Sequence, residues 1–185
     1  TAKLLGAESI DLTQTKDPRL AVMDWLRRPE NPYFARAMVN RLWAHYFGTG
    51  IIEPADDLNL ANPPSNRELL DHLAREFIAH KFDLKWLHRE IVNSDAYQRS
   101  WKPNDTNQLD HRHFSRAWPR RLAAEVTYDA VVQATSSPTR LAKLVADPTS
   151  RAIGHASVTN GANAYAMRVF GKPERLQTCD CERSD

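Results

Sequence analysis

The sequence has few cysteines, few glycines and no long hydrophobic run. Its 185 residues include two cysteines, which are too few for a disulfide framework. No stretch approaches the roughly 20 apolar residues of a membrane-spanning helix, so we expect no transmembrane segment. The six glycines form none of the nucleophile-elbow, P-loop or dinucleotide-binding motifs, and no H-E-x-x-H zinc motif is present. Because active sites can also be assembled from scattered residues, the sequence leaves open whether the chain is an enzyme.

An excess of charge of one sign is also missing. The chain carries 25 basic and 23 acidic residues, a formal net charge of +2. Without a clustered basic face this balance predicts no nucleic-acid partner. Hydrophobic residues make up 42% and charged residues 26% of the chain, as in ordinary globular domains.

Start and stop signals for helices recur along the chain. Asp-Pro and Asn-Pro pairs, a Ser-x-x-Glu capping box and a single Asp cap precede apolar positions at helical spacing. They predict helices over 18–28, 32–47, 65–80 and 83–93, and a fifth helix begins near Pro119 and ends before Pro138. Another turn or two is expected at 141–145. After Ala152 no strong helical period is present, and Val158, Tyr165, Met167 and Val169 indicate short strands or an extended tail.

These elements predict a mainly α fold. We expect a multi-helix orthogonal or bundle-like domain around a buried central helix at about 32–47, with an irregular or short-stranded C-terminal tail. The predicted organisation is an extended leader at 1–16, a helical domain at 17–146 and an irregular segment at 147–185. The chain opens at Thr1 without a targeting signal, so we expect it to be a fragment of a longer protein.

The central helix carries the richest group of polar residues. It is apolar nearly all round, and its polar side chains stand on the borders and need partners inside the fold. The nearest acidic residues follow in a short loop, and we predict a contact between Arg41 and Asp57. The candidate site comprises Arg36, Asn40, Arg41, His45, Glu53, Asp56 and Asp57.

Three interpretations of this cluster stay open. The first is a structural network of salt bridges and hydrogen bonds that anchors the loop to the helix, where losing one partner would strand a charge. The second is a ligand site in which Arg36 and Arg41 contact anions. The third is a cation site formed by Asp56, Asp57 and Asn59, for which calcium is the candidate; no other cofactor is predicted.

Several stretches resemble one family: the planctomycete-specific helical domain of unknown function. The resemblance covers roughly residues 17–136 and rests on Asn31-Pro32-Tyr33-Phe34-Ala35-Arg36, Asn40-Arg41-Leu42-Trp43, Phe47-Gly48, Asp56-Asp57, Pro63-Pro64-Ser65, Asp83-Leu84-Lys85 and Tyr97-Gln98. The segment that begins at Cys179-Asp180-Cys181 is similar to the start of the family's last conserved segment, so we expect the chain to stop before that segment ends.

The resemblance implies a context rather than a reaction. Such domains lie in the C-terminal part of large, exported proteins, behind another uncharacterised domain and often a cytochrome-c-like domain. We therefore expect an extracytoplasmic, non-catalytic helical accessory or interaction module whose partners are other domains of the parent chain or another protein. The alternative is a ligand-binding or hydrolytic domain for an acidic polysaccharide, with Arg36, Arg41 and His45 as anion contacts and Asp56 or Asp57 as the base.

Overall fold

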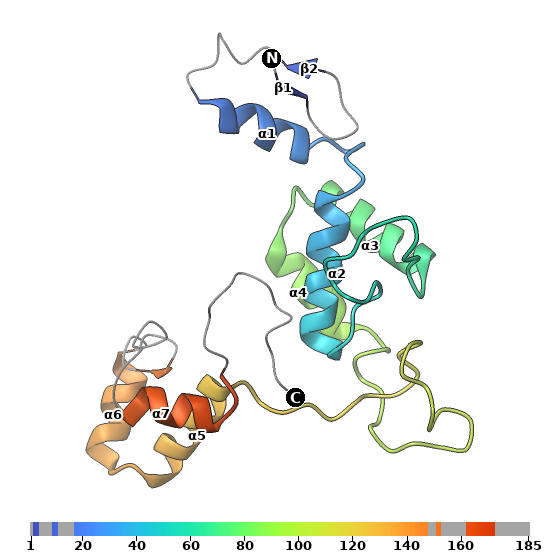
Figure 1. The fold of residues 1–185 in the computed structure, drawn as a ribbon. Helices are drawn as coiled ribbons and strands as arrows, with labels where there is room; N and C mark the ends of the chain where they lie inside the picture. Colours follow the sequence, from blue (N-terminus) through green and yellow to red (C-terminus); the bar gives the residue numbers. More distant parts are fainter. Residues whose placement is uncertain (1, 4–8, 11–16, 148–150, 153–161, 173–185) are drawn as a thin grey trace. The chain divides into compact units, whose positions relative to one another are not determined.

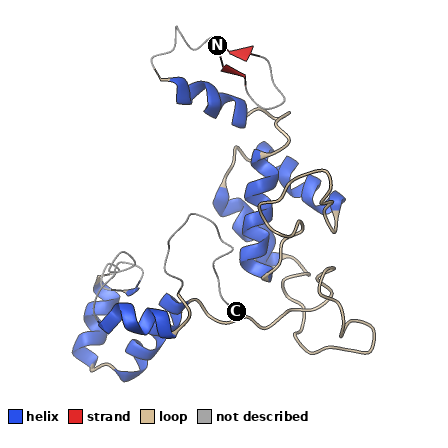
Figure 2. Ribbon diagram, viewed as in Figure 1, coloured by secondary structure: helices blue, strands red, loops and turns tan. Residues whose placement is uncertain are grey.

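The computed structural model describes residues 2–3, 9–10, 17–147, 151–152 and 162–172. Within these residues it contains seven helices and a single pair of two-residue strands, so the mainly α prediction is confirmed (Figures 1 and 2). The strands, β1 (Ala2–Lys3) and β2 (Ser9–Ile10), pair antiparallel. None of the described helices is both long enough and apolar enough to cross a bilayer. The chain divides into two compact units, residues 1–119 and 120–185, so the predicted domain at 17–146 includes parts of both.

The first helix begins at its predicted cap, and the second begins two residues later than predicted. α1 (Pro18–Leu26) starts after Asp17, whose side chain accepts from the backbone N–H of Arg19 at 3.0 Å. α2 (Phe34–Phe47) is capped by a residue that precedes it in the chain. Asn31 Oδ1 accepts from the backbone N–H groups of Tyr33 and Phe34. It ends at Gly48, whose φ of 79° is the left-handed conformation that favours glycine.

The next two helices form a helical hairpin. α3 (Arg67–Ala79) is capped by Asn66, which accepts from the backbone N–H of Leu69 at 3.0 Å. The predicted capping box at Ser65 was wrong by one residue, because the Ser65 hydroxyl donates instead to the carbonyl of Ile51. α4 (Leu84–Asn93) begins at the predicted cap Asp83.

The core of the first unit lies between α2, α3 and α4, which form one group in Figure 1. α2 is the buried central helix that the sequence predicts, because among its residues only Arg41 and His45 are exposed. Two residues of the following loop enter the same core. The buried residues are Ala35, Val39, Trp43, Ile51, Ile52, Leu70, Leu73, Ala74, Phe77, Leu87 and Ile91.

The second unit contains α5 (Ala124–Thr135), α6 (Pro138–Ala146) and α7 (Ala162–Val169). α5 begins later than predicted, and α6 is a helix with Ser137 as its cap rather than a turn or two. The prediction of short strands was wrong for Tyr165, Met167 and Val169, which lie in α7. The described core of the second unit is small. It consists of Ala124, Ala152 and Met167, and Tyr128 and Phe170 pack against them. Val158, Cys179 and Cys181 lie outside the described residues.

Candidate functional site

Asn40 is the fully buried member of the predicted cluster. It lies on α2, and its residue has 0% exposed surface. Its Nδ2 donates to the backbone carbonyls of Ile52 and Ala55, both at 2.9 Å, and its Oδ1 accepts from the backbone N–H of Ile52 at 2.9 Å. Both amide hydrogens and the amide oxygen therefore have partners, and this side chain fastens the loop after α2 to the helix.

Gly50 allows the close approach between this loop and the helix. A Cβ atom at position 50 would lie 2.2 Å from the carbonyl oxygen of Ile52 and 3.0 Å from Asn40 Nδ2. A larger residue would therefore push the backbone away from the helix. Glu53 also acts on this turn, because its Oε2 accepts from the backbone N–H of Gly50 at 2.8 Å.

The two arginines of the cluster pair with different carboxylates. Arg41 Nη2 lies 2.8 Å from Asp56 Oδ1, and about half of each side chain is exposed. The predicted partner Asp57 was wrong by one residue. Arg36 reaches α3 instead of the loop: its Nε and Nη2 lie 2.8 and 2.7 Å from Asp71 Oδ1. The structure therefore does not gather the two guanidinium groups around one shared anion site.

The remaining members of the cluster also have partners. The carboxylate of Asp57 accepts from the amides of Asn59 and Asn62. His45 is exposed, has an interaction partner within the chain, and makes an edge contact with Tyr46 at a ring-centroid distance of 5.3 Å. Most of the seven residues are therefore engaged in contacts between helices or between α2 and its loop, and a role in ligand binding stays a prediction.

The candidate cation ligands are partly engaged as well. Asp56 Oδ1 faces Arg41, and Asn59 Oδ1 accepts from the backbone N–H of Ala61 at 2.7 Å. Within the residues that the structure describes, no three His, Cys, Asp or Glu side chains are grouped so that they could hold a metal ion. The calcium site, which counts an asparagine among its ligands, stays a prediction.

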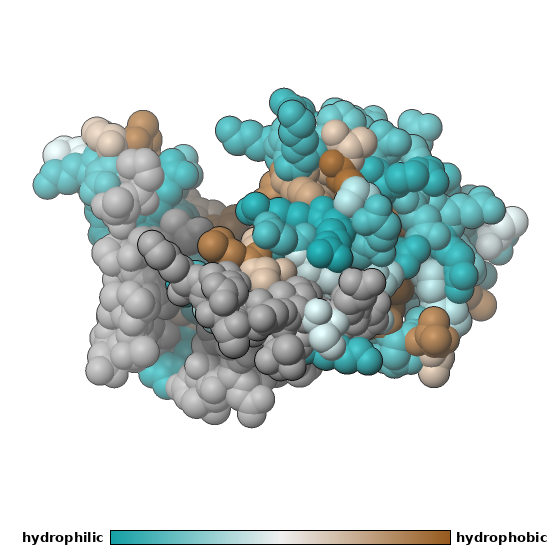
Figure 3. All heavy atoms as spheres, turned by 90° about the horizontal axis from the view of Figure 1, so that it is seen from above, coloured by the Kyte–Doolittle hydropathy of each residue, from teal (hydrophilic) through white to brown (hydrophobic). Residues whose placement is uncertain are grey.

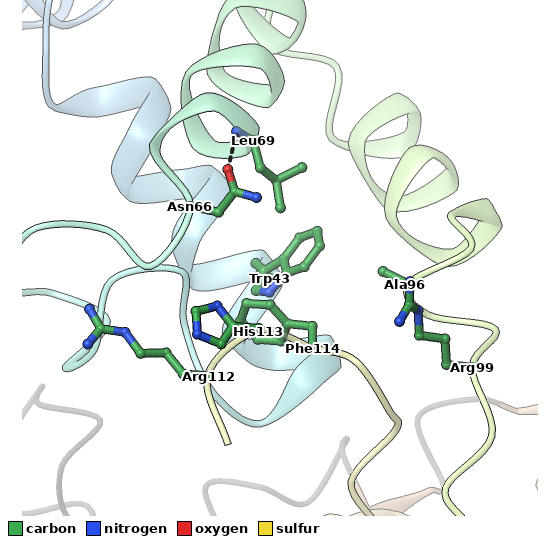
Figure 4. Close-up of a pocket in the computed structure, with 8 residues that line it drawn as sticks. All are labelled: Trp43, Asn66, Leu69, Ala96, Arg99, Arg112, His113 and Phe114. Atoms are coloured by element: carbon green, nitrogen blue, oxygen red, sulfur yellow. Dashed lines mark hydrogen bonds between the residues drawn. The ribbon is translucent and has the colours of Figure 1, made fainter. Parts of the chain in front are cut away.

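A cavity of about 220 Å³ borders the core at Trp43 (Figure 4). Its apolar lining comes from α2, α3 and the segments after α4. Its polar lining contains two arginines, a histidine and an asparagine, and no acidic residue. The lining residues are Trp43, Asn66, Leu69, Ala96, Arg99, Arg112, His113 and Phe114.

Trp43 forms part of the cavity wall and is held by aromatic neighbours. Its ring stacks on Phe47 at a centroid distance of 4.1 Å and meets the edge of Phe114 at 5.2 Å. Only 2% of the residue is exposed, and its indole Nε1 is buried with no hydrogen-bond partner in the described part of the chain. A buried N–H without an acceptor costs free energy, so this indole has an unused capacity to donate.

The loop that supplies His113 and Phe114 is folded around Asp110. The Asp110 carboxylate accepts from the hydroxyl of Ser115 and from the backbone N–H groups of Arg112, His113 and Ser115. Partial burial raises the pKa of Asp110, but these hydrogen bonds outweigh it and hold the pKa well below the ordinary range of an aspartate. Residues 110–115 thus form a hydrogen-bonded turn, in which residues 111–113 are exposed.

The residues that follow this loop form a cation–π contact between Arg116 and Trp118. The guanidinium carbon of Arg116 lies 3.4 Å from the centre of the Trp118 ring, and Trp118 Nε1 donates to the carbonyl of Asp110 at 3.0 Å. Sequence reasoning missed the cavity, because its lining residues come from segments that are far apart in the chain. It also missed Asp110, although the partners of this carboxylate lie within five residues of it. The sequence feature that could have indicated this region is the His-Arg-His run at 111–113, two members of which line the cavity.

A family model described as "PSD1: Protein of unknown function (DUF1553)" matches residues 18–183. No curated protein and no solved structure matches the chain significantly.

Proposed function

Because the chain belongs to the PSD1 family of proteins of unknown function (DUF1553), we propose its role from the geometry of its own residues: it is a non-catalytic helical module that binds a partner. The observation that carries this proposal is the pairing within the predicted cluster. Asn40 is buried and fully hydrogen-bonded, and Arg36 and Arg41 each have a separate carboxylate partner. A catalytic site would need these groups free to meet a substrate in an open cleft.

The second unit supports the binding part of the proposal. Its described core is small, and several of its large apolar side chains stay in contact with water: Leu122, Val126, Val131, Val145, Tyr165 and Val169 are each between 47% and 68% exposed. With so little apolar surface buried among its described residues, this unit would gain stability when a partner covers it. On the face seen in Figure 3, the described hydrophobic residues form small groups among hydrophilic ones, so no single large patch dominates that face.

An activity assay on acidic polysaccharides tests the non-catalytic part. The purified chain is incubated with polygalacturonate and alginate, and new reducing ends are measured. We expect none. If reducing ends form, and if Arg41→Gln abolishes them while leaving the unfolding midpoint unchanged, the hydrolytic alternative replaces the proposal. Arg89→Gln, a substitution of an exposed arginine on α4, is the matched control.

The cellular setting belongs to the same proposal. We propose that the module is the C-terminal part of a large exported protein, in the arrangement that resemblance to planctomycete domains of this kind implies. Fractionation of the source organism with an antibody against this chain tests the location. We expect the antigen outside the cytoplasm in a band much larger than this chain's 21.1 kDa, and a cytoplasmic band of 21.1 kDa would refute it.

A further inference from the structure

We infer that the cavity beside Trp43 binds an apolar group that ends in a carboxylate. This inference rests on the proposed function in one respect, because it assumes that the cavity binds a ligand and does not catalyse a reaction. Three observations carry the inference: the charge of the lining, the apolar wall and the unpartnered indole N–H. Each indicates a different part of the ligand.

The charge of the lining indicates an anion. Arg99 and Arg112 both line the cavity, and no acidic residue is among the lining residues. In the view of Figure 4 the two arginines lie on opposite sides of the cavity. Within the described part of the chain each guanidinium donates one hydrogen bond, from Arg99 to the carbonyl of Ser115 at 3.1 Å and from Arg112 to that of Pro63 at 3.5 Å. In the same view the guanidinium group of Arg112 points away from the cavity, so the further N–H donors for a carboxylate come from Arg99, while Arg112 contributes positive charge nearby.

The wall of the cavity indicates an apolar body. Trp43 and Phe114 supply aromatic surface, and Leu69 and Ala96 supply aliphatic surface. A volume of about 220 Å³ is below the size of most small-molecule sites, so the cavity suits a single ring or one amino-acid side chain. A ring of this kind would stack on or meet the edges of the two aromatic side chains.

The indole N–H and an amide supply neutral donors. Trp43 Nε1 is buried without a partner, and a ligand oxygen would provide the acceptor that it lacks if binding shifts the ring enough to open access to this N–H. Asn66 uses its Oδ1 to cap α3, which leaves its Nδ2 available at the cavity. Two neutral donors and two cations around an apolar wall match a carboxylate attached to an apolar group better than a polyanion or a neutral sugar.

Two sources share this chemistry: a free aromatic acid and the C-terminal residue of a peptide. Capture of a chain terminus through its carboxylate is a known mode of peptide recognition. The experiment therefore uses 3-phenylpropionate and a pentapeptide that ends in phenylalanine. Their controls are 3-phenylpropanamide and the same peptide with an amidated C-terminus, which keep the apolar group and remove the charge.

Binding is followed by two-dimensional ¹H–¹⁵N NMR of the full chain. Trp43→Phe assigns the indole signal of Trp43 among those of the five tryptophans. We expect saturable shifts of this signal with 3-phenylpropionate or the free-acid peptide, and an affinity at least tenfold lower for the amide of whichever ligand binds. Binding by the acid alone, the peptide alone or both identifies the source and supports the inference. No shift with either carboxylate, or equal shifts with acid and amide, overturns it.

Two variants test the assigned residues. Asn66→Asp keeps an oxygen that caps α3 but places a negative charge at the cavity, so we expect at least tenfold weaker binding with the helix intact. Arg99→Gln should weaken binding about tenfold by removing a charged donor, whereas Arg89→Gln on the exposed side of α4 should not. Unchanged affinity in both cavity variants overturns the assignment. A failure here leaves the proposed function standing, because the polysaccharide assay decides that question independently.

Discussion

Asn40 should be the polar residue on which the first unit depends most strongly. Asn40→Ala removes three hydrogen bonds and leaves the N–H of Ile52 and the carbonyls of Ile52 and Ala55 without their partner. Ile52 is 4% exposed, so water reaches these groups poorly. Each unsatisfied buried group costs about 1–3 kcal/mol, and we expect a total loss of about 3–5 kcal/mol in the free energy of unfolding.

The loss is large relative to the stability of an ordinary domain, which is about 5–15 kcal/mol. For a unit of this size it corresponds to a fall of roughly 10 °C or more in the unfolding midpoint. Circular dichroism gives the midpoint, and hydrogen exchange at the Ile52 amide reports the contact directly. We expect that amide to exchange much faster in Asn40→Ala than in the wild-type chain.

Asn40→Asp separates the effect of the lost hydrogen bonds on stability from the effect of lost side-chain volume, because aspartate and asparagine have nearly the same size. It keeps an acceptor for the Ile52 N–H but turns the two donated bonds into contacts between oxygens. Burial and the facing carbonyls raise the pKa of such an aspartate above its ordinary value. Its neutral form fits best, so the variant should be most stable at acid pH and should lose stability as the pH rises through that raised pKa.

The matched control is Asn93→Ala, which truncates an exposed asparagine at the end of α4 and should change the stability by less than about 0.5 kcal/mol. The reasoning would be refuted if Asn40→Ala cost no more than this control, or if Asn40→Asp were as stable as the wild-type chain at pH 7.

Three other substitutions test the remaining contacts. Gly50→Ala should lower the free energy of unfolding by about 1–3 kcal/mol, because its Cβ would overlap the carbonyl of Ile52; a wild-type urea midpoint would contradict the close approach. Arg41→Gln should cost at most about 1 kcal/mol in the same assay, because the pair with Asp56 is half exposed, and a larger loss would contradict its minor role. The pKa of Asp110 is lowered by folding, so its carboxylate stabilises the folded state above about pH 4 and loses this effect as the pH falls below that value. Asp110→Asn should therefore lower the unfolding midpoint at pH 7 and have less effect at pH 3, and an equal effect at both would exclude the carboxylate as the cause.

The sequence predicted best what depends on neighbouring residues. The starts at Asp17 and Asp83 and the stop at Gly48 need only a side chain or a backbone conformation next to the helix, and each is found where predicted. The cap of α3 was misplaced because Ser65 has a competing acceptor, the carbonyl of Ile51, which lies 14 residues away in the chain. α7 was missed because the apolar residues of so short a helix alternate in the sequence and imitate a strand.

The same distinction holds for the candidate site. Because α2 is apolar nearly all round, the sequence showed that Arg36 and Arg41 require partners. That Arg36 pairs with Asp71 depends on how α3 packs against α2. The cavity was beyond sequence reasoning for a similar reason. Trp43 comes from α2, whereas Arg99 and Phe114 come from segments more than 50 residues later, and no local spacing relates them.

The position of the Asn40 contact also has a consequence for the folding pathway. It joins residues only 12 to 15 positions apart, whereas the Arg36 pair spans 35 positions. The conformational entropy lost in closing a chain segment grows with its length, so the Asn40 contact is cheaper to form than the one between α2 and α3. α2 and its loop can therefore fold early as a local unit, and the surface they create is the one on which α3 and α4 later assemble.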